Sequence, residues 1–598
     1  MYRGIVILLL AIVLFNVIPS TIVVGSTPKV FNPPPKPEMV AYDNAPNEQM
    51  LRKSRVVSTS GYWSWQDYPF PLPDVEPIKV PVFVNLELAN SSYTPFTAVV
   101  KVPEGEWSKI LLRIDAKLYD PVFGRPVQYD RPLWVFINGV PVLWGSTAQR
   151  YNWTATADLT LFYSLFKDEV TVTLILPNWV VPRIGVTGRF LLNMTLLFYP
   201  GEKPDVPDVI VPLWMDTWME GLAVARPTLD KPNVTAPVTV PGNVVKAKLL
   251  MFTEGLVYDE FWYYYGTCYR EVKVYFDDKL VALIHPYHYI YTGGLMPFLW
   301  RPLPAVRTYA TEPVIVDVTG LLPLIVGDHN VTVEVTNIFS RSRWVIGGVL
   351  LLWTTTEPVK MELKYYNYTT TTNVEEETYE TFALYRVSTA FNLKGVSTIT
   401  VGDKQILATT LLLSTLDVVR TYNDVWDNIT LIEYRLSTTV EDVFKDGMRV
   451  GKYKWTNEWI GPLSVDYGFV VIPEGDISQA SVQNPVPATF SIIVSVMQGL
   501  STTTRTVTPA GLEVKVKATS LKESVDADNV LSGRLMFIAP TAAVITGITD
   551  VYASTLKTVI GLILGEDYTW IFSRGTFALT TMREWYKIIS DFLKIKEI

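Results

Sequence analysis

The stretch LWVFINGVPVLW, residues 133–144, consists of two short apolar runs on either side of Asn138-Gly139. Asn-Gly is the pair that a type I′ turn prefers, because both central residues of that turn need a positive φ. The stretch therefore predicts a tight hairpin within a β-sheet. A second stretch, VKVYFDDKLVALI at residues 272–284, has the same layout with an Asp-Asp pair in the middle. The same element is thus predicted twice, and this repetition decides the fold class.

The sequence around the two hairpins repeats as well. Arg131 and Arg270 precede the two hairpins at the same offset, and an Asp-x-Thr triplet follows each hairpin, at residues 158–160 and 317–319. Because the order of elements is shared, we expect two tandem β-sandwiches of the jelly-roll type. The second copy is longer, and its extra residues, HPYHYIYTGGLMPFLWRPLP at 285–304, resemble the inserted loops that hold function on repeated scaffolds.

The whole chain is expected to be mainly β. A capping box at Thr581-x-x-Glu584, followed by apolar residues at helical spacing, predicts one helix near the end. The expected organisation is a signal peptide or N-terminal anchor at 1–26, a Pro-rich extension at 27–80, a first sandwich at 81–203, a second sandwich at 204–356, and a β-rich C-terminal domain with this helix at 357–598.

Composition limits the classes of function. Of the 598 residues, 48% are hydrophobic and 18% charged, so the chain buries sizeable cores. A net charge of −8 without a long basic cluster argues against a nucleic acid as partner. Cys268 is the only cysteine, which excludes an intrachain disulfide and favours a buried thiol.

Metal and nucleophile motifs are absent from the sequence. The chain has three histidines, two of them His285 and His288, and this is a poor supply for a metal site. It has no Gly-rich phosphate loop, HExxH or GxSxG. We therefore expect no metal and no other cofactor, and carboxylates have to carry any hydrolysis.

The first residues have the layout of a secretory signal. Arg3 precedes an apolar run at residues 5–18, and the small pair Gly25-Ser26 follows. An uncleaved membrane anchor is the alternative, because the apolar stretch approaches the roughly 20 residues that span a bilayer. Low charge with abundant Thr and Tyr suggests an exoprotein adapted to an acidic medium. Seven Asn-x-Ser/Thr sequons are glycosylation candidates, although several are expected by chance in a Thr-rich chain: Asn90, Asn152, Asn193, Asn233, Asn330, Asn367 and Asn428.

Two adjacent acids precede five aromatics in VYDEFWYYY, residues 257–265. If the stretch is extended, alternation places Glu260, Trp262 and Tyr264 on one face. One interpretation is a strand end with a solvated acid and core rings. The other is a carboxyl group in a ring-lined site, where the pKa rises because the charged form is poorly solvated.

Asp130 and Arg301 are two further candidates for functional residues. Asp130 lies just before the first hairpin beside Arg131, whose charge can hold the carboxylate ionised, whereas a solvated loop acid is the alternative. Arg301 follows Trp300 in the long loop, where it either binds a ligand oxygen or braces the loop. Trp262 and Trp300 either stack on sugar faces or belong to the core.

These motifs carry a family resemblance. DEFWYYY, YREVKVYFDDKLVALI, a TGG turn, LWRP and NVTVEVTNIF, in this order, closely resemble the second domain of the almond-type peptide:N-glycanases (PNGase A). QYDRPLWVFINGVPVLW is similar to the first domain of that family, and the resemblance covers about residues 60–355. It implies two jelly rolls with the site at their interface. It also implies hydrolysis of the amide between Asn and the first GlcNAc of an N-linked glycan, which yields Asp and a glycosylamine.

The resemblance also implies roles for residues. Asp130 matches a catalytic aspartate in an aromatic-Asp-Arg motif, and Glu260 is the nearest counterpart of the second acid. We expect an ionised Asp130 to position water or the amide and Glu260 to donate a proton; the reverse assignment stays open. Gln149 stands where the plant enzymes have a glutamate, which puts substrate range and activity in doubt. The expected substrate-binding residues are Arg131, Trp262, Trp300 and Arg301.

Three classes of function therefore remain. The first is a secreted peptide:N-glycosidase, whose partners are N-glycosylated peptides or glycoproteins. The second is a non-catalytic glycan-binding or envelope protein on the same scaffold, which the change at Gln149 permits. The third is a glycoside hydrolase that uses the same carboxylates on a sugar bond.

Overall fold

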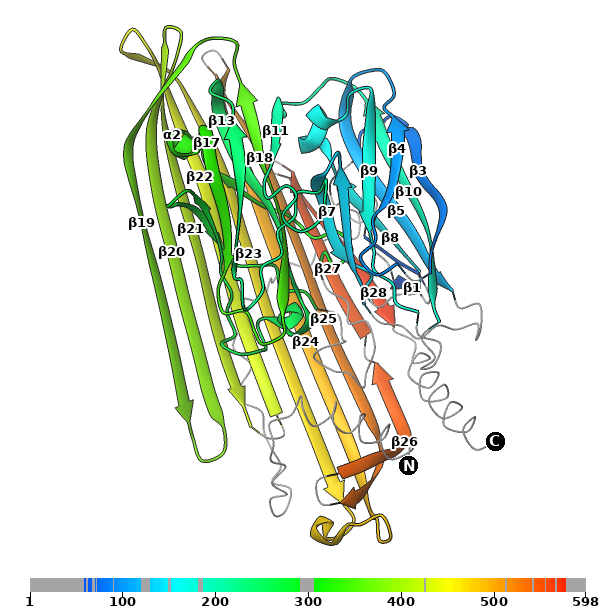
Figure 1. Cartoon of the computed structure of the whole chain (residues 1–598). Coiled ribbons are helices and arrows are strands. Elements are labelled where there is room, and N and C mark those ends of the chain that lie inside the picture. The colour runs from blue at the N-terminus through cyan, green and yellow to red at the C-terminus, as the bar shows by residue number, and fades with distance from the viewer. Residues whose placement is uncertain are drawn as a thin grey trace.

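Figure 1 shows the computed structural model of the chain as three β units: a first sandwich in blue, a second in green, and one long sheet behind the second. The expected mainly β class is confirmed. The structure describes residues 59–60, 63–66, 70, 72–89, 91–119, 130–148, 152–180, 187–290, 306–423, 426–510, 513–539, 542–553, 555–564 and 567–576. The expected signal segment, most of the Pro-rich extension and the expected C-terminal helix lie outside these residues. No helix among them is long and apolar enough to cross a membrane.

The first sandwich packs a six-stranded sheet, in the order β1-β2-β8-β5-β10-β3, with a four-stranded sheet, β4-β9-β6-β7. Alternation decides which face is buried: every second side chain of β10 from Phe190 to Phe198 points into the core. The strands are β1 (Thr59–Ser60), β2 (Trp63–Gln66), β3 (Ile78–Leu88), β4 (Phe96–Lys101), β5 (Trp107–Tyr119), β6 (Pro132–Ile137), β7 (Val140–Ser146), β8 (Asn152–Asp158), β9 (Glu169–Ile175) and β10 (Arg189–Pro200), with the 3-10 helix η2 (Thr160–Leu165) after β8.

The second sandwich consists of two four-stranded sheets, β11-β18-β13-β16 and β12-β17-β14-β15. Its elements are β11 (Val209–Pro212), β12 (Asn233–Val240), β13 (Val244–Leu256), the 3-10 helix η4 (Val257–Phe261), β14 (Val272–Phe276), β15 (Lys279–Ile284), β16 (Val314–Asp317), the 3-10 helix η5 (Thr319–Leu321), α2 (Leu322–Ile325), β17 (Gly327–Val335) and β18 (Arg343–Thr354).

Both predicted hairpins are present, β6 with β7 and β14 with β15. Asn138 and Gly139 have φ values of 50° and 78°, as a type I′ turn requires, and Asp277 has a φ of 51° in the second hairpin. The Asp-x-Thr triplets also match. The backbone N–H of Thr160 donates to Asp158 at 2.9 Å, and that of Thr319 donates to Asp317 at 3.0 Å.

The remaining described residues form one antiparallel sheet of ten strands, nine of them in the path β19-β20-β21-β22-β23-β24-β25-β27-β28 with β26 paired to β25. β25 has 27 residues, which corresponds to roughly 90 Å of extended chain. The strands are β19 (Val359–Thr378), β20 (Ala383–Val401), β21 (Lys404–Tyr422), β22 (Trp426–Lys445), β23 (Met448–Pro473), β24 (Val486–Ala510), β25 (Glu513–Ala539), β26 (Ala542–Ala553), β27 (Thr555–Leu564) and β28 (Asp567–Thr576); the 3-10 helix η6 (Ile477–Gln479) precedes β24.

Buried polar contacts attach the long sheet to the second sandwich. The His285 ring lies 2.8 Å from Ser414 Oγ through Nδ1 and 2.8 Å from Thr389 Oγ1 through Nε2. Burial lowers the pKa of His285 to about 3, so the ring is neutral at ordinary pH. Gln498 on β24 donates to the carbonyl of His288 at 2.9 Å. Both histidines are buried where the second sandwich meets the long sheet, and the contacts of the His285 ring and the His288 carbonyl join the two.

Candidate active site

The acid pair lies in a turn that the sequence did not predict. After β13, Val257 adopts a φ of 70° and residues 257–261 form the 3-10 helix η4. Gly255 permits this turn, because a Cβ at that position would lie 2.0 Å from the Asp259 carbonyl oxygen. The extended alternation considered for VYDEFWYYY is therefore wrong. Asp259 and Glu260 differ in burial within one helical turn: Asp259 is fully buried and Glu260 half-buried.

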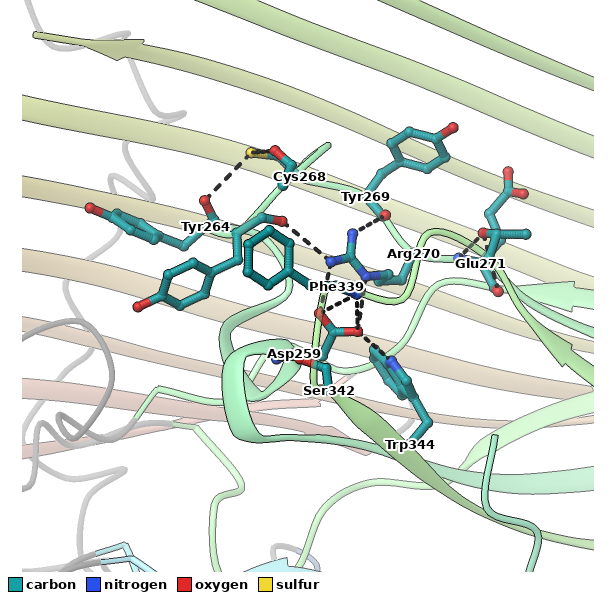
Figure 2. A network of polar contacts seen from close by, with 12 residues as sticks. Asp259, Tyr264, Cys268, Tyr269, Arg270, Glu271, Phe339, Ser342 and Trp344 are labelled. Atoms are coloured by element: carbon teal, nitrogen blue, oxygen red, sulfur yellow. Dashed lines mark hydrogen bonds and ion pairs between the residues drawn. The ribbon is translucent and has the colours of Figure 1, made fainter. Parts of the chain in front are cut away.

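Asp259 is a structural residue, and Figure 2 shows its contacts. Arg270 donates to both carboxylate oxygens, from Nη2 to Oδ1 at 2.7 Å and from Nε to Oδ2 at 3.2 Å. Trp344 Nε1 donates to Oδ2 at 2.8 Å, and the Phe339 N–H contacts both oxygens. Both members of the pair are 0% exposed. This two-bonded pair fixes the turn that presents Glu260.

Arg131 occupies the equivalent place in the first sandwich. It is 0% exposed, its Nε donates to Asn178 Oδ1 at 2.8 Å, and its guanidinium lies 4.8 Å from the centre of the Phe190 ring. Its backbone N–H donates to Thr147 Oγ1 at 3.1 Å. The expectation that Arg131 binds substrate is corrected, because the side chain is buried away from solvent. Arg131 instead holds the backbone next to Asp130, which is half-buried.

Glu254 is an acid that the sequence reasoning missed. It lies on β13 and is 1% exposed, and its Oε2 accepts a hydrogen bond from Trp134 Nε1 on β6 at 2.5 Å. Glu254 therefore joins the two sandwiches. Its other oxygen, Oε1, is buried and has no hydrogen-bond partner among the described residues. Burial, together with the negative charge of Asp130, raises the pKa of Glu254 to about 8 despite the bond from Trp134.

Electrostatic interactions connect the three acids. Tyr289 lies within reach of the charges of both Glu254 and Glu260, and these charges, after burial, hold its pKa well above the ordinary value. The charge of Asp130 acts on Glu254 in turn. Tyr289 is fixed by a contact of 2.7 Å between its hydroxyl and Thr311 Oγ1. Asp130 of the first sandwich thus lies within electrostatic reach of Glu254 of the second, and Glu254 and Glu260 both lie within electrostatic reach of Tyr289.

This arrangement suits acid-base chemistry. Because Glu254 has a pKa near 8, it holds a proton at neutral pH, and the half-buried Asp130 lies within electrostatic reach of it. Cleavage of an amide needs a base that activates water and an acid that protonates the leaving nitrogen. A signal for Glu254 did exist in the sequence: it is the one acid in the otherwise apolar run LLMFTEGL.

The aromatic residues around Glu260 differ from the expectation. Trp262 is 1% exposed, and its Nε1 donates to the Tyr287 carbonyl at 3.4 Å. Trp262 is therefore a core residue, and the expected stacking on a sugar is corrected. The rings within electrostatic reach of Glu260 are instead Tyr263, Tyr265 and Tyr289.

Several other expected residues lie outside the described part of the chain, namely Gln149, Trp300, Arg301 and the sequon residue Asn90. The described sequons divide by exposure. Three asparagines are half-buried, and two of these have side-chain partners within the described residues: Asn193 accepts from the Asn85 N–H, and Asn428 donates to Asp466. The exposed sequon residues are Asn233, Asn330 and Asn367.

Comparison with known proteins bears on this interface. Residues 74–268 and 264–371 match the family described as peptide N-acetyl-beta-D-glucosaminyl asparaginase amidase A. Through these residues the chain belongs to the peptide:N-glycanase A family. All three acids lie within the matched region. The peptide-N4-(N-acetyl-beta-glucosaminyl)asparagine amidase A of Prunus dulcis is 27% identical over 324 residues, or 48% of this chain and 53% of the relative. The chain thus spans about half the length of this peptide:N-glycanase A relative.

Solved structures show more distant similarity. PNGase F, a glycosylasparaginase from Flavobacterium meningosepticum, is 13% identical, with a TM-score of 0.33, and the match covers 47% of this chain and 96% of that one. PNGF-II is 17% identical, with a TM-score of 0.35 and coverage of 47% and 66%.

Proposed function

We propose that the protein is a peptide:N-glycosidase, which hydrolyses the amide between Asn and the first GlcNAc of N-linked glycans on peptides or glycoproteins. The single observation that carries this proposal is Glu254, a buried acid of the second sandwich that accepts a hydrogen bond from Trp134 of the first and lies within electrostatic reach of Asp130, inside the family-matched residues. Family membership and the amidase relative support the choice of an amide over a sugar bond.

In this proposal Asp130 and Glu260 carry out the two proton transfers. We assign the base to Asp130 rather than Glu254, because burial and the charge of Asp130 raise the pKa of Glu254 to about 8 and Glu254 therefore holds a proton at neutral pH. Asp130 then takes a proton from water as the water oxygen attacks the amide carbon. Glu260 supplies a proton to the nitrogen as the C–N bond breaks. The products are an aspartate on the peptide and a glycosylamine on the glycan, with all atoms of the water accounted for.

The test is cleavage of a defined N-glycopeptide followed by mass spectrometry of the peptide, at several acidic and neutral pH values. Conversion of the glycosylated Asn to Asp, with heavy oxygen incorporated from labelled water, is the expected result. A peptide that retains one GlcNAc would instead identify a glycoside hydrolase. Complete absence of cleavage would favour the non-catalytic glycan-binding alternative.

Substitution of the two half-buried acids tests their roles. Asp130→Asn and Glu260→Gln should each lower kcat by at least about a hundredfold, because each removes a proton-transfer group. Thermal unfolding of both variants should stay close to that of the wild type, because neither side chain is fully buried. Unchanged rates would contradict the assignment.

We also propose that the protein acts outside the cell. The apolar N-terminal run, the exposed sequon residues Asn233, Asn330 and Asn367, and a fold without disulfides in its described residues are compatible with export. The N-terminal sequence of the mature protein, taken from culture medium and from the membrane fraction, tests this. A cleaved form in the medium supports secretion, an intact form on membranes supports anchoring, and an intact cytosolic form contradicts both.

A further inference from the structure

A cavity of about 570 Å³ lies where both sandwiches meet the long sheet. Figure 1 shows β22 to β24 passing behind the second sandwich in this region. The first sandwich contributes Lys109 and Asp158, and the second contributes Lys248 and Glu312. The volume falls in the range of small-molecule pockets, about 300–1,000 Å³. None of the three acids of the candidate active site lines this cavity, so it is a separate site.

The long sheet forms a patterned wall of the cavity. Trp455, Asn457 and Trp459 alternate along β23 and therefore point to one face. Their register partners on β24, in the same order, are Thr506, Thr504 and Thr502. Asn457 Nδ2 donates to Thr504 Oγ1 at 2.9 Å. Thr502 Oγ1 is buried and has no hydrogen-bond partner among the described residues. The wall thus combines two indoles with a row of hydroxyl and amide groups.

A lysine and an arginine contact the two indoles. Lys248 Nζ lies 3.6 Å from the centre of the Trp455 ring, and Arg435 Cζ lies 4.1 Å from that of Trp459. A contact between a positively charged group and a ring face is attractive, and it holds the ring in one orientation. Trp455 remains half-exposed, whereas Trp459 is buried. Trp455 is therefore the ring that is available to a ligand.

The side chains of the opposite wall are polar, and their charges largely cancel. Lys109 Nζ pairs with Asp158 Oδ2 at 3.2 Å. Glu312 lies beside them, and burial raises the pKa of its carboxyl, which favours the neutral, donating form. Five ionisable side chains line the cavity, Lys109, Asp158, Lys248, Glu312 and Arg435, and this excludes a lipid chain as its occupant.

We propose that this cavity is a second carbohydrate site that takes a short neutral oligosaccharide. A pyranose ring has an apolar C–H face, which fits the indole of Trp455, and an edge of hydroxyls. These hydroxyls fit the side chains of Asn457 and Thr502 and the acids of the opposite wall. The site does not depend on the proposed amidase activity, because binding requires no Asn-linked amide.

The test is calorimetric titration of the full chain with chitotriose and, separately, with mannotriose. Binding of at least one of the two is expected. Trp455→Ala should raise its Kd by at least about tenfold through loss of the stacking surface. Asn457→Ala and Thr504→Val should each raise it by about threefold or more through loss of hydrogen bonds. Thr503→Val is the matched control, because the neighbouring residue on β24 points to the opposite face; its Kd should stay within about twofold.

The outcomes separate this proposal from its rivals. Absence of binding to both sugars, or equal Kd values for Asn457→Ala, Thr504→Val and Thr503→Val, would overturn it. Binding of 6-phosphomannose alone, without binding of either neutral sugar, would also overturn it. If Trp455→Ala does not fold, the comparison of Thr504→Val with Thr503→Val decides. Asp130→Asn should retain this binding while losing glycopeptide cleavage, so failure of the amidase proposal is distinguishable from failure of this one.

Discussion

Strands β5 and β13 occupy the same place in the two sandwiches and have the same length, 13 residues each. The first six residues of each have the same burial pattern. Beyond this point β5 alternates between buried and more exposed residues, whereas every residue of β13 is buried. The cause is what covers the outer face: Trp144 of the first sandwich stacks on Phe252 of β13 with ring centres 5.0 Å apart.

This difference explains where the acidic site arises. The tenth residue after the start of β5 is Lys117, which is exposed, and its counterpart in β13 is Glu254, which is fully buried. A position that is open to water in one copy thus becomes a buried ionisable position in the other, because the sandwiches pack against each other there. The pKa near 8 of Glu254 is a direct consequence of that packing.

Substitution of the two buried arginines should give the largest difference in stability between the two sandwiches. Arg270 is bonded twice to the Asp259 carboxylate, whereas Arg131 donates to the neutral Asn178. Arg270→Met leaves a buried carboxylate without its cation, so we expect the free energy of unfolding to fall by about 3–5 kcal/mol. Arg131→Met removes a charged hydrogen bond to an amide, and we expect a smaller loss of about 1.5–3 kcal/mol.

Urea unfolding of both variants measures this difference. Asp259→Asn should be nearly as destabilising as Arg270→Met, because it too breaks the pair from one side. Equal losses for Arg131→Met and Arg270→Met would show that the two arginines are equivalent in energy as well as in position.

The pH dependence of stability tests the contrast between Glu254 and Lys117. The pKa of Glu254 is raised from about 4.3 in the unfolded chain to about 8 in the folded protein. Between these values the folded state holds a proton that the unfolded state has lost, so stability falls as pH rises. The slope from this group is at most about 1.4 kcal/mol per pH unit. Glu254→Gln should remove that slope, and unfolding followed from about pH 5 to about pH 8 measures it.

Lys117→Gln is the matched control, because its side chain is exposed at the equivalent position. It should leave the wild-type slope unchanged over the same range. Other buried acids also contribute to the slope; burial raises the pKa of Glu433, for example, to about 8. Their contribution is the same in the wild type and in both variants, so the difference in slope between these proteins is the quantity to compare. Identical slopes for wild type and Glu254→Gln would contradict the buried, neutral state of this residue.

The sequence predicted what depends on local pattern. The two hairpins and the Asp-x-Thr triplets follow from short motifs, which act through nearby backbone. It did not predict the turn at η4, because a positive φ at Val257 is rare for a β-branched residue and depends on packing around Gly255. The sequence reasoning missed Glu254. Both faces of β13 are buried because the two sandwiches pack together there, so the strand does not show the alternation of apolar and polar residues from which burial is usually predicted.

The triplets should show the smallest difference in stability, because in both copies the threonine hydroxyl accepts a strand N–H, although the Thr160 hydroxyl donates to Asp158 and the Thr319 hydroxyl to the Ala247 carbonyl. Thr160 Oγ1 accepts from the Ile110 N–H at 3.2 Å, and Thr319 Oγ1 accepts from the Ala247 N–H at 3.2 Å. Thr160→Val and Thr319→Val each leave one buried strand N–H without its acceptor, so each should lower the free energy of unfolding by about 1–3 kcal/mol. The two losses should agree within about 0.5 kcal/mol by urea unfolding, because the same bond is lost in the same geometry. A larger loss at Thr319 would mean that the contact of η5 with β21, where Gly320 N–H donates to Thr410 Oγ1 at 2.9 Å, depends on the triplet, and the equivalence of the two copies would then end where the long sheet begins.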